Sequence, residues 1–332
     1  MMQKRGNHYL VLIAICVIGV GALLVGRHFA DKVSQDKTGS SGTKEAQEVQ
    51  SGGGESGDAA TSAQQNKDGS GDATEIAKQE NPLIDAEGNT LETRIHTPEG
   101  YTRVAEDAGS LASFLRTYKM KKDGSPVRLY DGKKKGNQNA HAAIFRLPIE
   151  KVDLQQCADS VMRVYAEYYW HTDQKDKIAF HFVDGFLAKY SKWQQGYRID
   201  VSDNGSSWVK SASADSSYSC FQKYLRVVFS YASTLSMEQE SRKIKLTELQ
   251  VGDIFIKGGS PGHVVMVVDV CENANGEKAF LLAQGYMPAQ EFHVLKNPAH
   301  AEDPWYYVDE VSYPFETPEY TFEKGSLRRP GY

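Results

Sequence analysis

Three residues in the C-terminal half of the chain have the side chains of a thiol-based acyl-transfer site. They are Cys220, His263 and Gln284, and they follow one another in that order. A thiolate attacks carbonyl carbon, an imidazole takes up and returns the proton, and a third polar group holds the imidazole in the useful tautomer. The order therefore predicts Cys220 as nucleophile, His263 as base and then acid, and Gln284 as the residue that orients the ring.

The predicted helix over residues 220–238 would position the nucleophile. Apolar residues recur along it at helical spacing, and Ser217 or Ser219 precedes it as a potential cap. Cys220 stands in the first turn, where helix amides stabilise a thiolate. We therefore expect this thiol to have a pKa below its ordinary value.

Strands are predicted for the other two residues. The stretch SPGHVVMVVDV begins a nearly unbroken apolar run with His263, and AFLLAQGY carries Gln284 after the polar turn ENANGEK. With the strand of GDIFI before them, these segments form three antiparallel strands after a helix, which indicates an α+β domain. Gln284 is expected beside His263, in a register that the sequence does not fix.

A second thiol, Cys157, competes for the role of nucleophile. It lies near the start of DLQQCADSVMRVYAEYYW, a predicted helix in which Asp153 and Gln156 have the spacing of a capping box. Cys157 also lies on the apolar stripe of that helix, where burial raises the pKa of a thiol. Structural packing is the favoured interpretation for Cys157, and a catalytic role stays open.

Other cofactor chemistry has little support in the sequence. Cys157, Cys220 and Cys271 are either three buried thiols or one bridged pair and one free thiol. No histidine or cysteine pair has zinc-ligand spacing, and no Gly-rich phosphate loop follows a strand. We predict neither a metal nor an organic cofactor.

The N-terminal quarter has a different composition. Residues 9–26 are eighteen uncharged, mostly apolar residues, which predict a membrane anchor within 1–30, or a signal sequence. Residues 31–80 are rich in Gly, Ser and acids and predict a disordered linker. Its ten acids and five lysines account for the net charge of −5, so residues 81–332 form a predicted globular domain without the basic excess of a nucleic-acid-binding protein.

Two resemblances extend this interpretation. The region from Cys220 to about Val294, including GDIFI before the histidine strand, resembles the core of NlpC/P60 cysteine peptidases, which cleave peptides of the cell wall. These peptidases usually have an Asp-Cys-Ser-Gly motif at the nucleophile, and this sequence has YSCF there instead. The stretches GSPVRLYDG, DLQQCADSVMR, PGHVVMVVD and LLAQGYMPAQEFHVLKNP resemble the bacterial domain-of-unknown-function family 4846. The second resemblance implies that Cys157 is the characteristic thiol.

Together these patterns predict a papain-like or NlpC/P60-like core of helix and antiparallel sheet, with an N-terminal lobe of strands and one long helix. The predicted function is a bacterial inner-membrane protein with an extracytoplasmic domain that hydrolyses cell-wall peptide or amide bonds. The alternative is a non-catalytic envelope binding or scaffold domain, in which a groove rimmed by Trp305, Tyr306, Tyr307 and the GYMPAQ loop, residues 285–290, holds a ligand.

Overall fold

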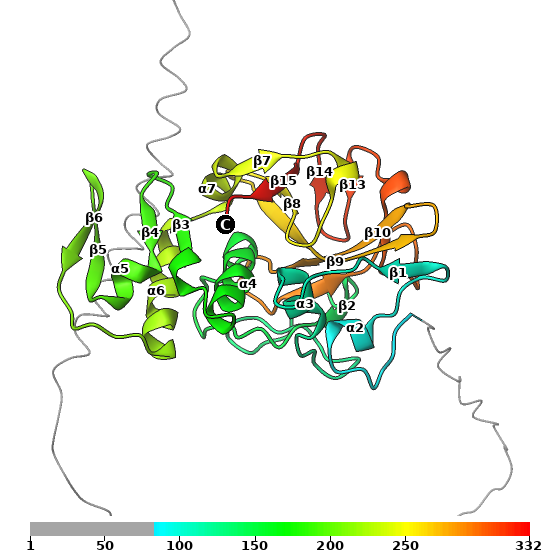
Figure 1. Ribbon diagram of the computed structural model, residues 1–332, viewed down its shortest axis with the longest axis horizontal. Helices are drawn as coiled ribbons and strands as arrows, with labels where there is room; N and C mark the ends of the chain where they lie inside the picture. Colours follow the sequence, from blue (N-terminus) through cyan, green and yellow to red (C-terminus); the bar gives the residue numbers. More distant parts are fainter. Residues whose placement is uncertain (1–82) are drawn as a thin grey trace, which may run out of the picture. The chain divides into compact units, whose positions relative to one another are not determined.

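The computed structural model describes residues 83–332, which form a mixed α/β domain around one large antiparallel sheet (Figure 1). The predicted anchor and linker lie outside these residues. Within residues 83–332, no helix combines the length and hydropathy needed to cross a bilayer.

The main sheet has nine strands. Seven of them run in the order β2-β11-β10-β9-β8-β15-β7, while β1 pairs with β9 and β12 pairs with β10, and every pairing is antiparallel. Their bounds are β1 Tyr101–Arg103, β2 His141–Ile144, β7 Ser241–Lys243, β8 Ile254–Lys257, β9 His263–Asn273, β10 Lys278–Gln284, β11 His293–Leu295, β12 Tyr306–Tyr307 and β15 Leu327–Pro330.

Strand β9 lies at the centre of this sheet and is buried from His263 to Cys271. Its apolar residues do not alternate with polar ones because both faces are covered. In the view of Figure 1, helices α3 (Leu111–Arg116) and α4 (Cys157–His171) lie below β9, and the hairpin of β13 (Phe315–Glu316) and β14 (Thr321–Phe322) lies above it. The predicted strands β8, β9 and β10 are confirmed.

Helix α4 is the long helix that the sequence predicted, but it begins later than expected. Its N-cap is Gln156, whose backbone N–H donates to Asp159 Oδ2 at 3.1 Å. Asp153 lies outside the helix, where its Oδ1 accepts from Gln156 Nε2 and from the backbone N–H of Ala289. The predicted capping pair, Asp153 and Gln156, was therefore wrong by three residues. The pair that caps the helix, Gln156 and Asp159, has the same spacing in the sequence, so spacing alone could not distinguish the two.

The second predicted helix is two helices. Helix α6 spans Tyr218–Tyr231, and the backbone N–H of Cys220 donates to Ser217 Oγ at 3.2 Å, so the expected serine cap is confirmed. Ala232 is extended, and Ser233 then caps α7, Thr234–Gln239. The continuous helix over 220–238 was wrong because a capping serine interrupts the apolar stripe.

The predicted N-terminal lobe is not a separate unit. Strands β1 and β2 join the main sheet, and only a smaller set of elements lies beside it, on the left of Figure 1. These are the hairpins β3–β4 and β5–β6 with α5 and α6, where the new bounds are β3 Ala179–His181, β4 Leu187–Lys189, β5 Tyr197–Ser202, β6 Gly205–Lys210 and α5 Tyr190–Gln194. Pairing between strands far apart in the chain is not visible in local periodicity.

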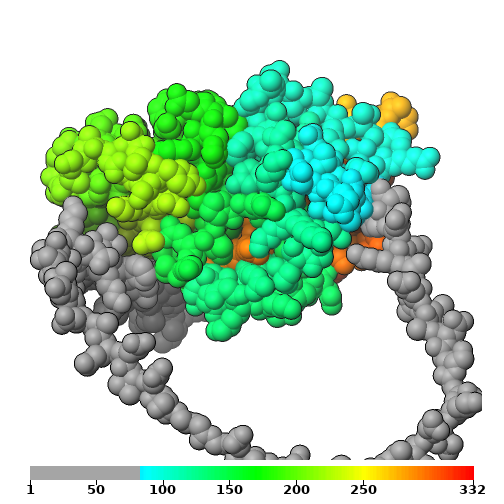
Figure 2. Space-filling model, turned by 90° about the horizontal axis from the view of Figure 1, so that it is seen from below, coloured from blue at the N-terminus to red at the C-terminus, as the bar shows by residue number. Residues whose placement is uncertain are grey.

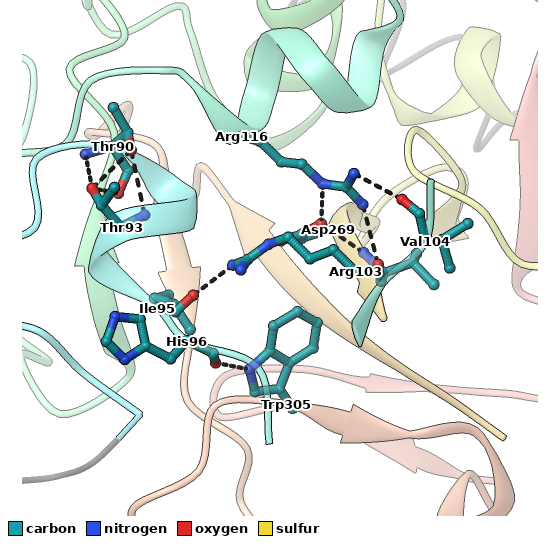
Figure 3. Close-up of polar contacts among 10 residues, drawn as sticks. Thr90, Thr93, Ile95, His96, Arg103, Val104, Arg116, Asp269 and Trp305 are labelled. Atoms are coloured by element: carbon teal, nitrogen blue, oxygen red, sulfur yellow. Dashed lines mark hydrogen bonds and ion pairs between the residues drawn. The ribbon is translucent and has the colours of Figure 1, made fainter. Parts of the chain in front are cut away.

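An aspartate clamp ties the N-terminal segment to β9 (Figure 3). The carboxylate of Asp269 is fully buried and accepts from Arg103 Nε at 2.7 Å and from Arg116 Nε at 2.8 Å. Arg116 also donates hydrogen bonds to the carbonyl oxygens of Val104 and Val270. In Figure 2 the first described residues, in cyan and teal, cover much of one face, and orange residues show between them and the green residues and again at the upper right edge.

The clamp gives the first prediction. Asp269→Ala leaves two arginines around a buried site without their acceptor, and we expect a loss of about 3–5 kcal/mol in the free energy of unfolding, measured by chemical denaturation. Asp203→Ala, in the exposed β5–β6 turn, is the matched control and should change it by less than about 0.5 kcal/mol. Equal denaturation midpoints for the two variants would contradict the role of the clamp.

Candidate functional site

A cleft of about 420 Å³ opens at the N-terminus of α4. Segments from five parts of the chain surround it: the start of α4 with the residues before it, the α6–α7 junction, the turn before β9, the loop after β10 and the β13–β14 turn. The residues that line it are Asp153, Leu154, Gln156, Cys157, Ala158, Asp159, Phe229, Ala232, Ser233, Thr234, Gly259, Ser260, Pro261, Gly262, His263, Tyr286, Met287 and Tyr320.

Cys157 is the first residue of α4 and is 9% exposed. Gly285, just after β10, allows the helix to approach the sheet this closely, because a Cβ there would lie 2.2 Å from Ser160 Oγ and 2.9 Å from the Gln156 carbonyl oxygen. The backbone N–H groups of Ala158 and Val264 lie where they lower the pKa of the thiol. Val264 follows His263, so the thiol faces the first residues of β9.

His263 is the first residue of β9, and 2% of it is exposed. Two aromatic rings enclose its imidazole: the Tyr286 centroid lies 4.7 Å away and the Tyr320 centroid 4.9 Å away. Both tyrosines also line the cleft, and the charge of a Cys157 thiolate would raise the pKa of each. Thiol, imidazole and both phenols thus form one cluster.

The imidazole has a fixed polar partner. His263 Nε2 lies 2.7 Å from Gln284 Oε1, at the end of β10. An amide oxygen only accepts, so Nε2 carries the proton in this pair and the neutral ring keeps Nδ1 as its acceptor. That tautomer is the one in which His263 can take a proton through Nδ1.

The electrostatics keep both groups uncharged at rest. Burial raises the pKa of Cys157 to about 11, helped by the charge of Asp159, and the nearby backbone N–H groups lower it only partly. Burial also lowers the pKa of His263 to about 4, and the charge of Lys135 acts in the same direction, while the Gln284 hydrogen bond opposes them. At neutral pH the pair is thiol and imidazole, not thiolate and imidazolium.

Asp159 is an unusual carboxyl group in the cleft wall. It is 7% exposed, and its Oδ1 is buried without a hydrogen-bond partner. Burial raises the pKa of this carboxyl to about 8, against the lowering effect of the cap hydrogen bond from Gln156. It is therefore mostly protonated at neutral pH, when it does not repel a thiolate at Cys157.

A family model described as "Domain of unknown function (4846)" matches residues 91–329. The chain belongs to this family. The match runs from the start of α2 (Leu91–Arg94) almost to the end of β15, so Cys157, His263 and Gln284 all lie within the DUF4846 domain. No curated protein and no solved structure matches the chain.

Cys220, the nucleophile predicted from the sequence, does not line the cleft of the DUF4846 domain. It is buried at the start of α6, and its pKa is raised by burial and then by the charge of Asp215, while the charge of Arg198 lowers it. The structure thus brings His263 and Gln284 together and places the competing thiol, Cys157, in the same cleft as His263. Asp159, an acidic residue three positions after Gln156, is the sequence signal that could have indicated that α4 begins at Cys157.

The lowered pKa expected for the Cys220 thiol is wrong, whereas the raised pKa expected for Cys157 on its apolar stripe agrees with the structure. Burial raises the pKa of Cys157, of Cys220 and, to about 12, of Cys271. All three are buried free thiols. Among residues 83–332, no group of three histidine, cysteine or acidic side chains is arranged to hold a metal ion.

The predicted rim of the groove needs correction. Trp305 is fully buried and donates through Nε1 to the His96 carbonyl oxygen at 2.8 Å, as Figure 3 shows. Tyr306 is buried as well, with its hydroxyl bound to the Lys296 carbonyl oxygen. These two aromatic residues belong to the core, whereas Tyr286 and Met287 of the predicted GYMPAQ rim do line the cleft, together with Tyr320.

The close approach at Gly285 gives the second prediction. Gly285→Ala places a methyl group against Ser160 and Gln156, and we expect it to cost about 1–3 kcal/mol in the free energy of unfolding and to change the alkylation rate of Cys157. Gly136→Ala, which introduces a methyl group into open space, is the control and should change neither. If the two variants behave alike, Gly285 does not set the position of α4.

Asp159 gives the third prediction. Its carboxyl titrates near 3.8 ordinarily and near 8 when folded, so between these pH values the folded state holds a proton that the unfolded chain has lost. The contribution of Asp159 to the free energy of unfolding of the parent therefore falls as pH rises through this window. Asn at this position carries no such proton, so Asp159→Asn should gain stability relative to the parent at up to about 1.4 kcal/mol per pH unit from about pH 4 to 8.

Urea denaturation at several pH values measures this difference. Asparagine keeps an oxygen for the Gln156 N–H, so the helix cap survives the substitution. Asp153→Asn is the matched control for loss of a carboxylate from the same cleft. If the difference in free energy of unfolding between the parent and Asp159→Asn stays constant from pH 4 to 8, the Asp159 carboxyl is not the titrating group.

Proposed function

We propose that this domain is a cysteine hydrolase of peptide or related amide bonds, with Cys157 as nucleophile, His263 as base and then acid, and Gln284 as the residue that orients the imidazole. The observation that carries the proposal is the shared cleft: Cys157 at a helix N-terminus and His263 at a strand start line it, and Gln284 binds the Nε2 side of the ring. This arrangement supports a papain-like or NlpC/P60-like core whose helix is α4.

The chemistry follows from the neutral pair. His263 Nδ1 takes the proton of the Cys157 thiol as the sulfur attacks the carbonyl carbon, and backbone N–H groups of Ala158 and Val264 stabilise the charge that forms on sulfur. The imidazolium then gives its proton to the leaving amine, and the acyl group remains on the sulfur as a thioester. Water, deprotonated by His263, releases the acid and restores the thiol.

The neutral resting state has a defined consequence. A low pKa keeps Nδ1 free to accept a proton at neutral pH, but it makes His263 a weak base, and the high pKa of Cys157 adds to the barrier. Substrate binding must therefore assist proton transfer, for instance by excluding water from the cleft. The same two pKa values favour the alternative, a binding domain that retains the fold without turnover.

A cell-wall peptide bond is the proposed target, and the membrane is the proposed location. Residues 9–26 have the length and hydropathy of an anchor, and the fifty residues of the linker would let the domain reach roughly 40 Å from the bilayer. Protease treatment of intact cells tests the orientation. Digestion of the domain only after lysis would contradict an extracytoplasmic position.

The fourth prediction tests the hydrolase directly. We expect the full chain, incubated with purified cell wall, to release peptides with new carboxyl and amino ends detectable by mass spectrometry. Cys157→Ser should lower the rate at least about 10³-fold, because the nucleophile is lost. Cys220→Ser is the matched control and should retain the rate of the parent.

Two outcomes would redirect the assignment. Loss of activity in Cys220→Ser together with retention in Cys157→Ser would return the nucleophile to α6. No products from the parent, with binding of cell-wall fragments that Cys157→Ser retains, would replace the hydrolase with the binding domain.

A further inference from the structure

A buried ion pair lies behind Gln284. Lys135 Nζ donates to Glu319 Oε2, and only 8% and 11% of the two side chains are exposed. Glu319 stands in the β13–β14 turn, where the Thr317 backbone N–H binds the Tyr320 carbonyl oxygen, and Lys135 comes from the loop before β2. Burying two charges costs several kcal/mol in desolvation, so an ion pair in this position is weak evidence for stability and calls for another role.

The pair continues directly into the proposed site. Gln284 Nε2 donates to Glu319 Oε2 at 2.8 Å, while Gln284 Oε1 lies 2.7 Å from His263 Nε2. Asn137 Nδ2 donates to the other oxygen, Glu319 Oε1, at 3.1 Å. The contacts form one chain from Lys135 through Glu319 and Gln284 to His263.

Lys135 and Glu319 determine which group donates and which accepts in each hydrogen bond of this series. An ammonium only donates and an ionised carboxylate only accepts, so the Gln284 amide must present its NH₂ to Glu319. Its oxygen then faces His263, and the proton of the imidazole must lie on Nε2. Without the carboxylate, nothing at this end would prevent the amide from rotating by 180° and presenting its NH₂ to the ring.

We propose that Glu319, held by Lys135, is a positioning residue that fixes the Gln284 amide and through it the Nε2–H tautomer of His263. The tautomer follows from the contacts alone, and its use in catalysis rests on the proposed function. Neither Glu319 nor Lys135 lines the cleft, so both act through Gln284.

Nitrogen NMR of the full chain labelled with ¹⁵N-histidine tests the proposal at neutral pH, with the His263 signals assigned from their absence in His263→Asn. In the parent we expect a protonated Nε2 and an unprotonated Nδ1. In Glu319→Ala we expect loss of this single tautomer, as a mixture or as Nδ1–H. Persistence of a pure Nε2–H tautomer in folded Glu319→Ala would overturn the proposal.

Two further variants sharpen the test. Glu319→Gln keeps an oxygen that can accept from Gln284 and Lys135, so it should retain the tautomer of the parent, and loss of the tautomer there would overturn this assignment of donors and acceptors. Where Glu319→Ala fails to fold because Lys135 is left unpaired, Lys135→Met/Glu319→Ala removes both charges and must show the same loss of the tautomer. Asn137→Ala is the control, and it should keep the parent tautomer because it leaves the Gln284 contact in place.

Activity provides an independent readout. If the parent hydrolyses its substrate, Glu319→Ala should lower kcat roughly 10²–10⁴-fold with little change in KM, and Glu319→Gln should recover most of that loss. A parent without activity contradicts the proposed function but leaves the tautomer result to decide the role of Glu319. An active parent whose kcat and tautomer both survive Glu319→Ala contradicts the positioning role alone.

Discussion

Burial of β9 on both faces is the constraint on which the rest of the structure depends. A polar side chain on a strand without solvent must find hydrogen-bond partners elsewhere in the chain. β9 carries two such side chains, His263 at its start and Asp269 near its middle, and both are buried. Asp269 forms ion pairs with two arginines of the N-terminal segment, and His263 forms a hydrogen bond with Gln284 of β10. The same requirement thus shapes both the fold around the sheet and the cleft at its edge.

The cleft follows from how α4 meets this strand. Gly285 leaves no side chain between the helix start and the end of β10, so Cys157 comes close to the first residues of β9. The same closeness removes water from the thiol, which explains why burial outweighs the helix amides and raises its pKa. Under the proposed function, the reactive thiolate would therefore form when the substrate binds and would not be present in the resting protein.

The sequence predicts the strands and the His263–Gln284 pair better than it predicts which thiol shares the cleft with His263. An apolar run that begins with a histidine and a polar turn before the next strand are local signals, and they led to β9, β10 and the neighbourhood of His263 and Gln284. The choice of helix was not local. Cys157 and Cys220 both stand in the first turn of amphipathic helices, and only long-range packing decides which helix lies against β9.

Other parts of the site were beyond sequence reasoning for the same reason. Glu319 and Lys135 are separated by 184 positions, and their contact depends on a two-stranded hairpin that local patterns do not predict. Trp305 and Tyr306 stand in an aromatic run that suggested a binding rim, but the pairing of β12 with β10 places them in the core. The burial of Cys157 was foreseen from its position on the apolar stripe, yet burial and a place in the cleft wall proved compatible.

Covalent trapping tests the central claim, the pairing of Cys157 with His263, most directly. The full chain is treated at neutral pH with a peptidyl chloromethyl ketone, and the modified residue is located by mass spectrometry of proteolytic fragments. Our account predicts modification of Cys157 in the folded parent, faster than in a denatured control, and a rate reduced to the denatured level or below in His263→Ala. Modification of Cys220 in preference to Cys157, or a rate at Cys157 that His263→Ala leaves unchanged, would contradict it.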